Sequence, residues 1–339
     1  MRCLRTTGGA VAVLLLSGLP VQAQAPRPPA QTQKIEISAQ LIEAFDSRDP
    51  ALTQFGALRF RGGLVLTSPH RDFGGLSALR MSADGMRLLA VTDKGRWVRA
   101  RVVTRNGRAI ALADAEIAEM LGPDGRPITS RRGWYDTEAL AEDGGTLYVG
   151  TERAHQILRF DYGKDGLRAR GHPIAVPPGV KALPLNQGIE CLAAPPKGQP
   201  HAGALIAISE RGLDAAGNIL GFLIGPGGGT FSVKRTDEFD VSDCALTPRG
   251  DLLILERRFS WTRGLAIRIR RVPLARIAPR AVIDGPEMLF ADMSHQIDNM
   301  EGIAVHREAS GALVVTLISD DNFSALQRTL LLQFTLVGE

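Results

Sequence analysis

The most constraining feature of this sequence is a unit that recurs five times and carries acids at matching places in two short strands. In each unit the first predicted strand opens on a small polar or acidic residue, and the second ends on an acid 13 to 20 residues later. The pairs are Ser77 with Asp93, Glu138 with Glu152, Glu190 with Glu210, Asp243 with Glu256, and Glu301 with Asp320. Repeats of roughly 50 to 60 residues made of short strands are typical of propeller blades.

The placement of these acids predicts where they meet. In an antiparallel pair, the start of the first strand and the end of the second lie at the same end of the sheet. Every unit therefore delivers its acids to one common mouth. We expect the acids of all five units to surround that mouth.

The rest of each unit completes a blade of four strands. The second strand is almost continuously apolar (LLAV, LIAI, LLIL), which suits a strand covered on both faces by neighbouring blades. The last unit lacks an outer strand, and residues 62–67 can fill that place. We therefore predict an all-β propeller of five repeats, forming a single domain over 34–339 and closed by strands from both termini. Further strand-like sequence in 34–60 keeps six blades as an alternative.

An insertion in the first repeat interrupts this rhythm. Residues 113–121 (ADAEIAEML) have the pattern of an amphipathic helix that ends at Gly122-Pro123. The following basic and aromatic segment, 129–134, comes immediately before the acidic strand of the second repeat. We expect this segment to be either a lid over the mouth or a surface decoration.

The N-terminus has the pattern of an export signal. Arg2 and Arg5 precede a short apolar run and a small-x-small cleavage site, which predicts a Sec-type signal peptide over 1–23 and a flexible leader over 24–33. The apolar run is too short to span a membrane. We therefore expect a periplasmic or secreted protein with no membrane span after cleavage.

Two cysteines remain after the signal is removed, and each follows the acid that opens its strand. Cys191 and Cys244 occupy a position that holds Ala or Gly in the other repeats. An oxidising compartment permits a disulfide between them. We favour two packed thiols, because inner strands of neighbouring blades usually lie too far apart for the required Cα separation.

The charge balance excludes one class of partner. The formal net charge of +4 falls to +2 when Arg2 and Arg5 leave with the signal, and the sequence has no basic run with interleaved aromatic residues. Such a chain lacks the electrostatic footprint of nucleic-acid binding. We expect a monomer that acts on a small molecule.

The converging acids are the candidate site. Many carboxylates around one channel repel one another unless bases or a hard cation offset them. Bases follow several acids of the second strands, at Lys94, Arg153, Arg211 and Arg257. Ion pairs between blades would explain this second set without any catalytic role, whereas the acids of the first strands have no adjacent base and suit a cation. Ser77 stands where the other repeats have an acid, which marks a position for a ligand or the seam of the ring.

Several phrases in order carry a resemblance to a known family. FGGLSAL with DGMRLLAVTDKG, DTEALA with LYVGTER, NQGIECLA with LIAISERG, and DNMEGIAV resemble the phytase-like β-propeller family, named for the esterase-like activity of phytase. The resemblance covers about residues 55 to 337. It implies an exported hydrolase of phosphate esters such as phytate, with Ca²⁺ as its cofactor, and it assigns no catalytic residue.

The residues and the resemblance together give one leading hypothesis, an exported, metal-assisted hydrolase of phosphate esters whose substrate is a phosphorylated small molecule. The expected Ca²⁺ ligands are Glu138, Glu190, Asp243 and Glu301, the catalytic residues are Glu138, Glu190 and Glu301, and the substrate-binding residues are Lys94, Arg153, Arg211 and Ser77. A non-catalytic propeller that binds a ligand or a protein in the cell envelope is one alternative. A calcium-dependent lactonase or esterase is another.

Overall fold

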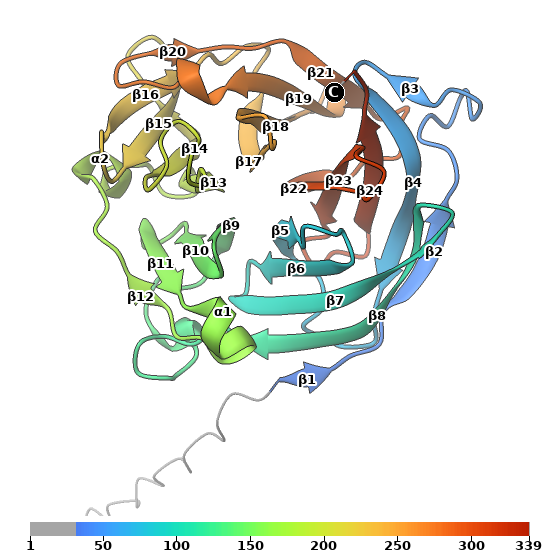
Figure 1. The fold of residues 1–339 in the computed structure, drawn as a ribbon, viewed down its shortest axis with the longest axis horizontal. Coiled ribbons are helices and arrows are strands. Elements are labelled where there is room, and N and C mark those ends of the chain that lie inside the picture. The colour runs from blue at the N-terminus through green and yellow to red at the C-terminus, as the bar shows by residue number, and fades with distance from the viewer. Residues whose placement is uncertain (1–31, 339) are drawn as a thin grey trace, which may run out of the picture.

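The computed structural model describes residues 32–338, which form five sheets arranged as blades around one axis (Figure 1). The predicted signal peptide at 1–23 and most of the predicted leader lie outside the described residues. No helix within 32–338 is long and apolar enough to cross a membrane.

The blades follow one another along the chain, and each has its first strand nearest the axis. Blade 1 contains, from its outer edge to the axis, β1 (Gln33–Lys34), β8 (Arg108–Glu119), β7 (Arg96–Arg105), β6 (Arg87–Thr92) and β5 (Leu76–Met81). Blade 2 contains β12 (His172–Pro173), β11 (Gln156–Phe160), β10 (Thr146–Thr151) and β9 (Thr137–Asp143). Blade 3 contains β20 (Val282–Ile283), β16 (Gly229–Val233), β15 (Ile219–Ile224), β14 (Leu205–Leu213) and β13 (Ile189–Ala193). Blade 4 contains β21 (Glu287–Asp292), β19 (Gly264–Pro273), β18 (Asp251–Ser260) and β17 (Asp240–Leu246).

Blade 5 joins the two ends of the chain. It contains β2 (Ser38–Ile42), β4 (Leu58–Thr67), β24 (Thr329–Leu336), β23 (Leu313–Asp320) and β22 (Asn299–Arg307), with β3 (Gln54–Phe55) paired to β4. β24 pairs antiparallel with β4 along its whole length. The predicted closure by N- and C-terminal strands is therefore confirmed. The strands in 34–60 extend blade 5 or pair with blade 1, so the described residues form five blades and no sixth.

Helical structure is sparse and lies in connections. The described residues contain the α-helices α1 (Tyr162–Asp165) and α2 (Pro178–Lys181) and the 3₁₀ turns η1 (Ile128–Ser130), η2 (Gly166–Arg168) and η3 (Leu274–Arg276).

The hydrophobic core consists of five layers, each between two neighbouring blades. Alternate residues of a strand point to opposite faces, so each second strand feeds two layers. In β18, Leu252 and Ile254 pack against blade 3, whereas Leu253 and Leu255 pack against blade 5. This explains why the central positions of the second strands are apolar on both faces.

The helix that we predict at 113–121 is wrong, because 113–119 belong to the long strand β8 and 120–121 follow that strand without helical structure. β8 pairs with the whole of β7, and register shifts allow its apolar residues to reach the core. Leu112, Ala115 and Ile117 pack in the layer between blades 5 and 1, and Ala118 packs in the layer between blades 1 and 2. Backbone pairing with β7 thus overrides a local pattern that a helix and a strand both satisfy.

The preference for two free thiols is also wrong. Cys191 on β13 and Cys244 on β17 form a disulfide, with their Cα atoms 5.1 Å apart. That separation is within the usual range for a disulfide. The innermost strands of a five-bladed ring converge on a narrow axis, so neighbouring inner strands come closer than the prediction assumed.

Candidate active site

A cavity of about 830 Å³ opens at one end of the propeller axis and is lined mainly by carboxyl groups. Its polar wall comprises Asp93, Asp136, Glu138, Glu152, Asn186, Glu190, Glu210, Arg257, Asp298, Asn299, Glu301, Asp320, Asn322, Gln327 and Arg328. Nine of these are acids and two are arginines. The common acidic mouth that the repeats predict is present, and its charge is strongly unbalanced.

Three acids from the innermost strands meet at the base of this cavity. Glu138 on β9, Glu190 on β13 and Glu301 on β22 each offer an oxygen within 4.8 Å of the other two, and all three are buried. A second group of carboxylates, Glu152, Glu190 and Glu210, meets the same criterion. Glu190 belongs to both groups, so it is the central acid of the site.

Burial and mutual repulsion make these acids hard to ionise. Burial raises the pKa of Glu138 well above its ordinary value, and Glu301 and Asp136 raise this pKa further. Burial, with Glu138 and Glu301, raises the pKa of Glu190 in the same way. Perturbed groups of this kind cluster at functional sites.

The acids of the second strands that line the cavity are shifted in the same direction. Burial raises the pKa of Asp320 to about 8, that of Glu210 to about 7 and that of Asp93 to about 6. Burial also raises the pKa of Glu152, which accepts a hydrogen bond from the Gly188 N–H at 3.0 Å. Near neutral pH some carboxyl groups of the cavity are therefore protonated and others are ionised.

Arg257, in the second half of β18, contacts the acids directly. Its Nη1 lies 3.1 Å from Glu301 Oε1 and donates to Asn299 Oδ1 at 2.6 Å, while its Nη2 donates to Glu210 Oε1 at 3.3 Å. Asn299 in turn donates to Glu301 at 2.7 Å. Burial lowers the pKa of Arg257, but the surrounding carboxylates Glu301 and Glu210 outweigh burial and raise it.

Asp243 is the predicted metal ligand that the structure places elsewhere. It is fully buried on β17, accepts a hydrogen bond from the Ile303 N–H at 2.8 Å, and lies 3.5 Å from Arg80 Nη1. Burial raises the pKa of Asp243 to about 7, against the lowering effect of Arg80. Asp243 thus binds an arginine, and it is not among the residues that line the acidic cavity.

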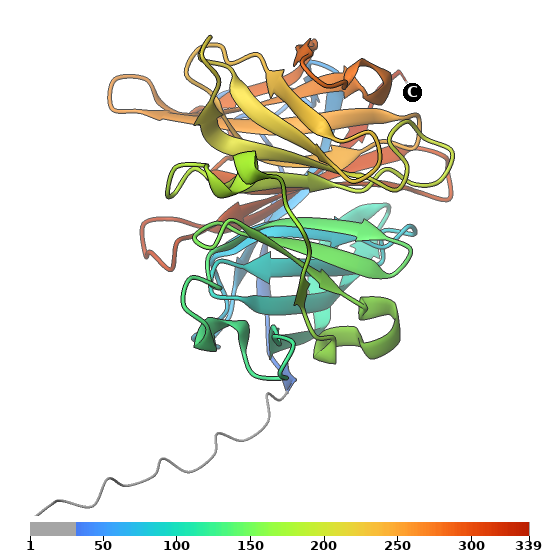
Figure 2. The ribbon, with the colours of Figure 1, turned by 90° about the vertical axis from the view of Figure 1, so that its left-hand side faces the viewer.

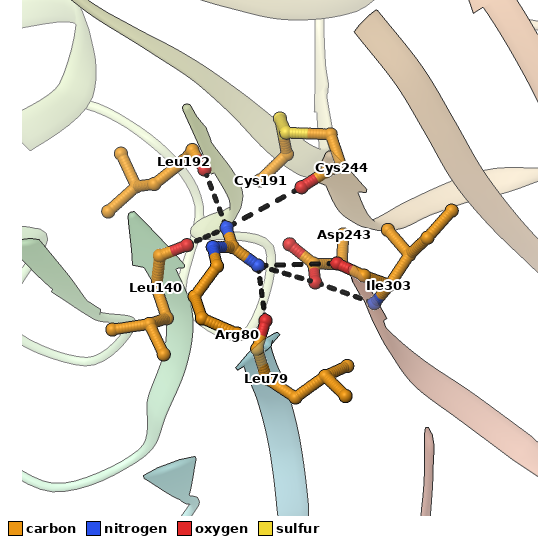
Figure 3. The surroundings of a disulfide bond; sticks show 8 residues. All are labelled: Leu79, Arg80, Leu140, Cys191, Leu192, Asp243, Cys244 and Ile303. Carbon is orange, nitrogen blue, oxygen red and sulfur yellow. Dashed lines mark hydrogen bonds and ion pairs between the residues drawn. A yellow bond between two sulfur atoms is a disulfide. The ribbon is translucent and has the colours of Figure 1, made fainter. Parts of the chain in front are cut away.

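Arg80 joins all five blades at this point, as Figure 3 shows. Its guanidinium group donates to backbone carbonyls of the innermost strand of every blade, at Leu79, Leu140, Leu192, Cys244 and Ile303. The side chain of Arg80 lines a separate, smaller pocket. A charged group held by carbonyls from every blade closes the axis below the acids.

The predicted substrate-binding residues lie around the cavity, and none of the four is among its lining residues. Ser77 is fully buried on β5, and its hydrogen bond to Glu138 opposes the rise in the pKa of that acid. Lys94 lies over the ring of Phe323. Arg153 donates to Asp136 at 2.7 Å, and Arg211 lies 3.3 Å from Asp240.

Among the second-strand acids, Glu256 is the one that does not line the cavity. It is fully buried and receives both Arg268 and Arg270, with Nε atoms 2.7 Å from its Oε2. Both arginines lie on β19 of the same blade, so this pairing is within blade 4 and differs from the pairing between blades that we consider as an alternative for that set of acids. Asp93, Glu152, Glu210 and Asp320 instead line the cavity.

The 129–134 segment, predicted as a lid or a decoration, packs through Trp134 against the hydrophobic layer between blades 1 and 2. The Arg131 guanidinium lies 4.9 Å from the Trp134 ring centroid. Among the described residues, none from 129–134 lines the cavity. The nearest lining residue after this segment is Asp136.

The titration of the cavity predicts how the stability of the cation-free protein varies with pH. Acids with raised pKa values keep their protons in the folded chain but lose them at about pH 4 in the unfolded chain. Their favourable contribution is therefore present at low pH and is lost as the pH rises through the folded values, about 7 for Glu210 and about 8 for Asp320. We expect the melting temperature in chelator to fall by several degrees between pH 5 and pH 8.5. A melting temperature that rises over this range would contradict the assignment.

The fold and the site together define a five-bladed β-propeller with a carboxylate-lined cavity on its axis. A profile of the Phytase-like family, described as "Esterase-like activity of phytase", matches residues 71–323, and the chain belongs to this family. Among curated proteins, no sequence matches the chain.

Similarity to solved structures is confined to the general fold. Glutaminyl cyclase from Myxococcus xanthus is 13% identical, with a TM-score of 0.40 over 79% of this chain and 94% of its own. The PQQ-bound aldose sugar dehydrogenase from Streptomyces coelicolor is 12% identical, with a TM-score of 0.43 over 91% of this chain and 100% of its own. The α-L-arabinofuranosidase PaAbf62A from Podospora anserina is 10% identical, with a TM-score of 0.46 over 78% of this chain and 93% of its own.

Proposed function

We propose that this protein is a divalent-cation-dependent hydrolase of phosphate esters, with Ca²⁺ held by Glu138, Glu190 and Glu301. The observation that carries the proposal is the meeting of these three buried carboxylates, with ligand oxygens within 4.8 Å of one another. Carboxylate oxygens are the ligands that Ca²⁺ prefers. Membership of the phytase-like family supports a phosphate ester as the substrate.

A second observation supports a cation at this place. Glu190 is 4% exposed, and among the described residues its Oε2 has no hydrogen-bond partner. A buried carboxylate oxygen without a partner is costly, and a hard cation satisfies it. Arg257 cannot take this role for all the acids, because its two Nη atoms already contact Glu210, Glu301 and Asn299.

The bound cation would neutralise phosphate oxygens and act as a Lewis acid. The residues of the chain position the substrate around it. Arg257 lines the cavity, and its guanidinium can donate to a phosphate oxygen, a charge-assisted contact that fixes orientation. This assignment moves the anion clamp from Lys94, Arg153 and Arg211 to a residue inside the cavity.

Hydrolysis forms a bond from a water oxygen to phosphorus and breaks the bond from phosphorus to the ester oxygen. The water must lose a proton, and the departing alcohol must gain one. Asp320, with its pKa raised to about 8, holds a proton at neutral pH and is suited to give it to the alcohol. Glu152, which lines the same cavity, is suited to accept the proton of the water.

Export also remains part of the proposal. The disulfide between Cys191 and Cys244 supports a periplasmic or secreted location, because disulfides persist in oxidising compartments.

An assay with matched substrates tests the proposed activity. Purified protein is incubated with p-nitrophenyl phosphate, phytate and a panel of lactones, each with Ca²⁺ and with chelator. We expect release of phosphate that needs Ca²⁺ and that is lost in Glu301→Gln. Glu142→Gln, an exposed position further along β9, is the matched control and should retain the activity. If only lactones are hydrolysed, the substrate is a carboxylic ester and not a phosphate ester. If no substrate is hydrolysed, the protein is a non-catalytic binding propeller.

A further inference from the structure

One sector of the cavity mouth carries apolar side chains, four of them strongly exposed and the fifth, Leu265, partly buried. The side chains concerned, called here the apolar shelf, are Phe259, Trp261, Leu265, Met293 and Leu326. Phe259 is 64% exposed, Met293 is 68% exposed, and Trp261 and Leu326 are each 94% exposed. They come from the β18–β19 hairpin, the β21–β22 connection and the β23–β24 connection, all in blades 4 and 5. Figure 2 shows the orange hairpin and the dark red connection projecting on the same side of the propeller.

The shelf is continuous with the acidic site. Phe259, Leu265, Met293 and Leu326 line the same cavity as the acids. Phe259 follows Arg257 by two residues on β18, and residues i and i+2 of a strand point to the same side. The strand that carries the anion-binding arginine therefore extends outward as an apolar surface.

The shelf has internal structure. The rings of Phe259 and Trp261 contact edge to face, with centroids 5.4 Å apart. Gly264 adopts a positive φ of 69°, and a Cβ atom there would lie 3.0 Å from Met293 Cγ, so the methionine lies close against the hairpin backbone. Contiguous exposed apolar side chains of this kind mark binding sites, whereas single exposed ones do not.

The other side of the mouth has a different character. Asp136 and Asn186 line the cavity there, and Arg153 pairs with Asp136 beside them. A ligand that fills the whole mouth thus meets charge at the base and polar groups on one side. On the other side it meets apolar groups that alternate with Asn322, Gln327 and Arg328. Such a ligand must itself be amphipathic.

We propose that the substrate is an amphipathic phosphate ester, whose phosphate enters the acidic cavity and whose alkyl or aryl group lies on the apolar shelf. This inference rests on the proposed function and names its substrate class. It also separates the protein from an enzyme built for a phosphorylated polyol such as phytate, which carries no apolar part to occupy the shelf.

Binding of unhydrolysable analogues tests the inference without requiring turnover. Alkylphosphonates from butyl to decyl are titrated in the presence of Ca²⁺, below the concentrations at which they form micelles. The dissociation constant should fall on the order of two- to fourfold for each added methylene. In the double variant Phe259→Ser with Leu326→Ser this dependence on chain length should largely disappear. Both residues are exposed, so melting curves should show that the variant is folded.

A control variant and a second ligand complete the design. Val282→Ser removes an exposed apolar side chain from β20, outside the cavity, and should keep the full dependence on chain length. An affinity that does not change with chain length, or a dependence retained in the double variant, would overturn the inference. A second result would also overturn the inference. If the protein binds phosphatidylcholine vesicles that contain no alkylphosphonate as tightly as it binds the alkylphosphonates, a lipid surface is the occupant of the shelf.

The two proposals can fail separately. Chain-length-dependent binding without hydrolysis of any ester would support the shelf and defeat the hydrolase. Hydrolysis of phytate and short esters at rates that do not depend on an apolar group would support the hydrolase and defeat the shelf.

Discussion

Replacing Arg80 by methionine is expected to lower the free energy of unfolding by about 3 to 5 kcal/mol at pH 8.5. The substitution keeps an apolar stem but leaves Asp243, which is fully buried, without its cationic partner. It also removes the donor to carbonyls from all five blades (Figure 3). Urea denaturation of the wild type and the variant measures the difference.

The pH dependence of this loss identifies its cause. The pKa of Asp243 is about 7 with Arg80 present, and removing the arginine raises it further. Below pH 6 the acid keeps its proton in both proteins, so the loss should shrink to the part contributed by the carbonyls. Arg87→Met, at an exposed position on β6, is the control and should change the stability by less than about 0.5 kcal/mol. A loss below 1 kcal/mol at pH 8.5 would show that Arg80 does not hold the ring together.

Replacing Glu190 by glutamine should weaken Ca²⁺ binding on the order of 100-fold or more, because affinity depends strongly on the number of charged ligands. Glu190 is the acid common to both carboxylate groups and has the oxygen without a partner. Calorimetric titration with Ca²⁺ measures the affinity. The rise in melting temperature on adding Ca²⁺ should also disappear.

The same substitution should stabilise the cation-free protein at pH 8. It removes one of the buried carboxyl groups whose pKa values are raised by burial and repulsion, so less free energy is lost when the cavity ionises. Opposite effects on stability and on cation binding are expected of a functional site and not of a structural ion pair. Glu142→Gln should leave both properties as in the wild type. If Glu190→Gln binds Ca²⁺ as tightly as the wild type, the proposed ligand set is wrong.

The sequence was sufficient to predict the ring and most of its acidic mouth, because both follow from the repeat. The start of each innermost strand lies at the same end of the axis. The repeat alone therefore predicts that Glu138, Glu190 and Glu301 lie close together. Asp243 departs from this pattern because it pairs with Arg80, a residue of blade 1. Arg80 stands three positions after Ser77, where the other repeats have Ala141, Ala193, Leu246 and Ala304. This one charged residue at an apolar position was the available signal.

Other features depended on tertiary contacts that the sequence pattern does not encode. The pattern of 113–121 fits a helix and a strand alike, and pairing of β8 with β7 decides between them. The Cys191–Cys244 disulfide depends on how closely β13 and β17 approach at the axis. Arg257 was visible as one of several bases after the second strands, but its selection over Lys94 and Arg211 depends on the geometry of the cavity. The apolar shelf comes from connections whose positions only the closed ring defines.

The most direct test of the proposed calcium site is an anomalous diffraction measurement on crystals grown with Ca²⁺ at pH 8. We predict an anomalous peak between the carboxylates of Glu138, Glu190 and Glu301, with oxygen distances of about 2.3 to 2.6 Å. A cavity without such a peak, in which these three carboxyl groups share protons through hydrogen bonds to one another, would contradict this prediction.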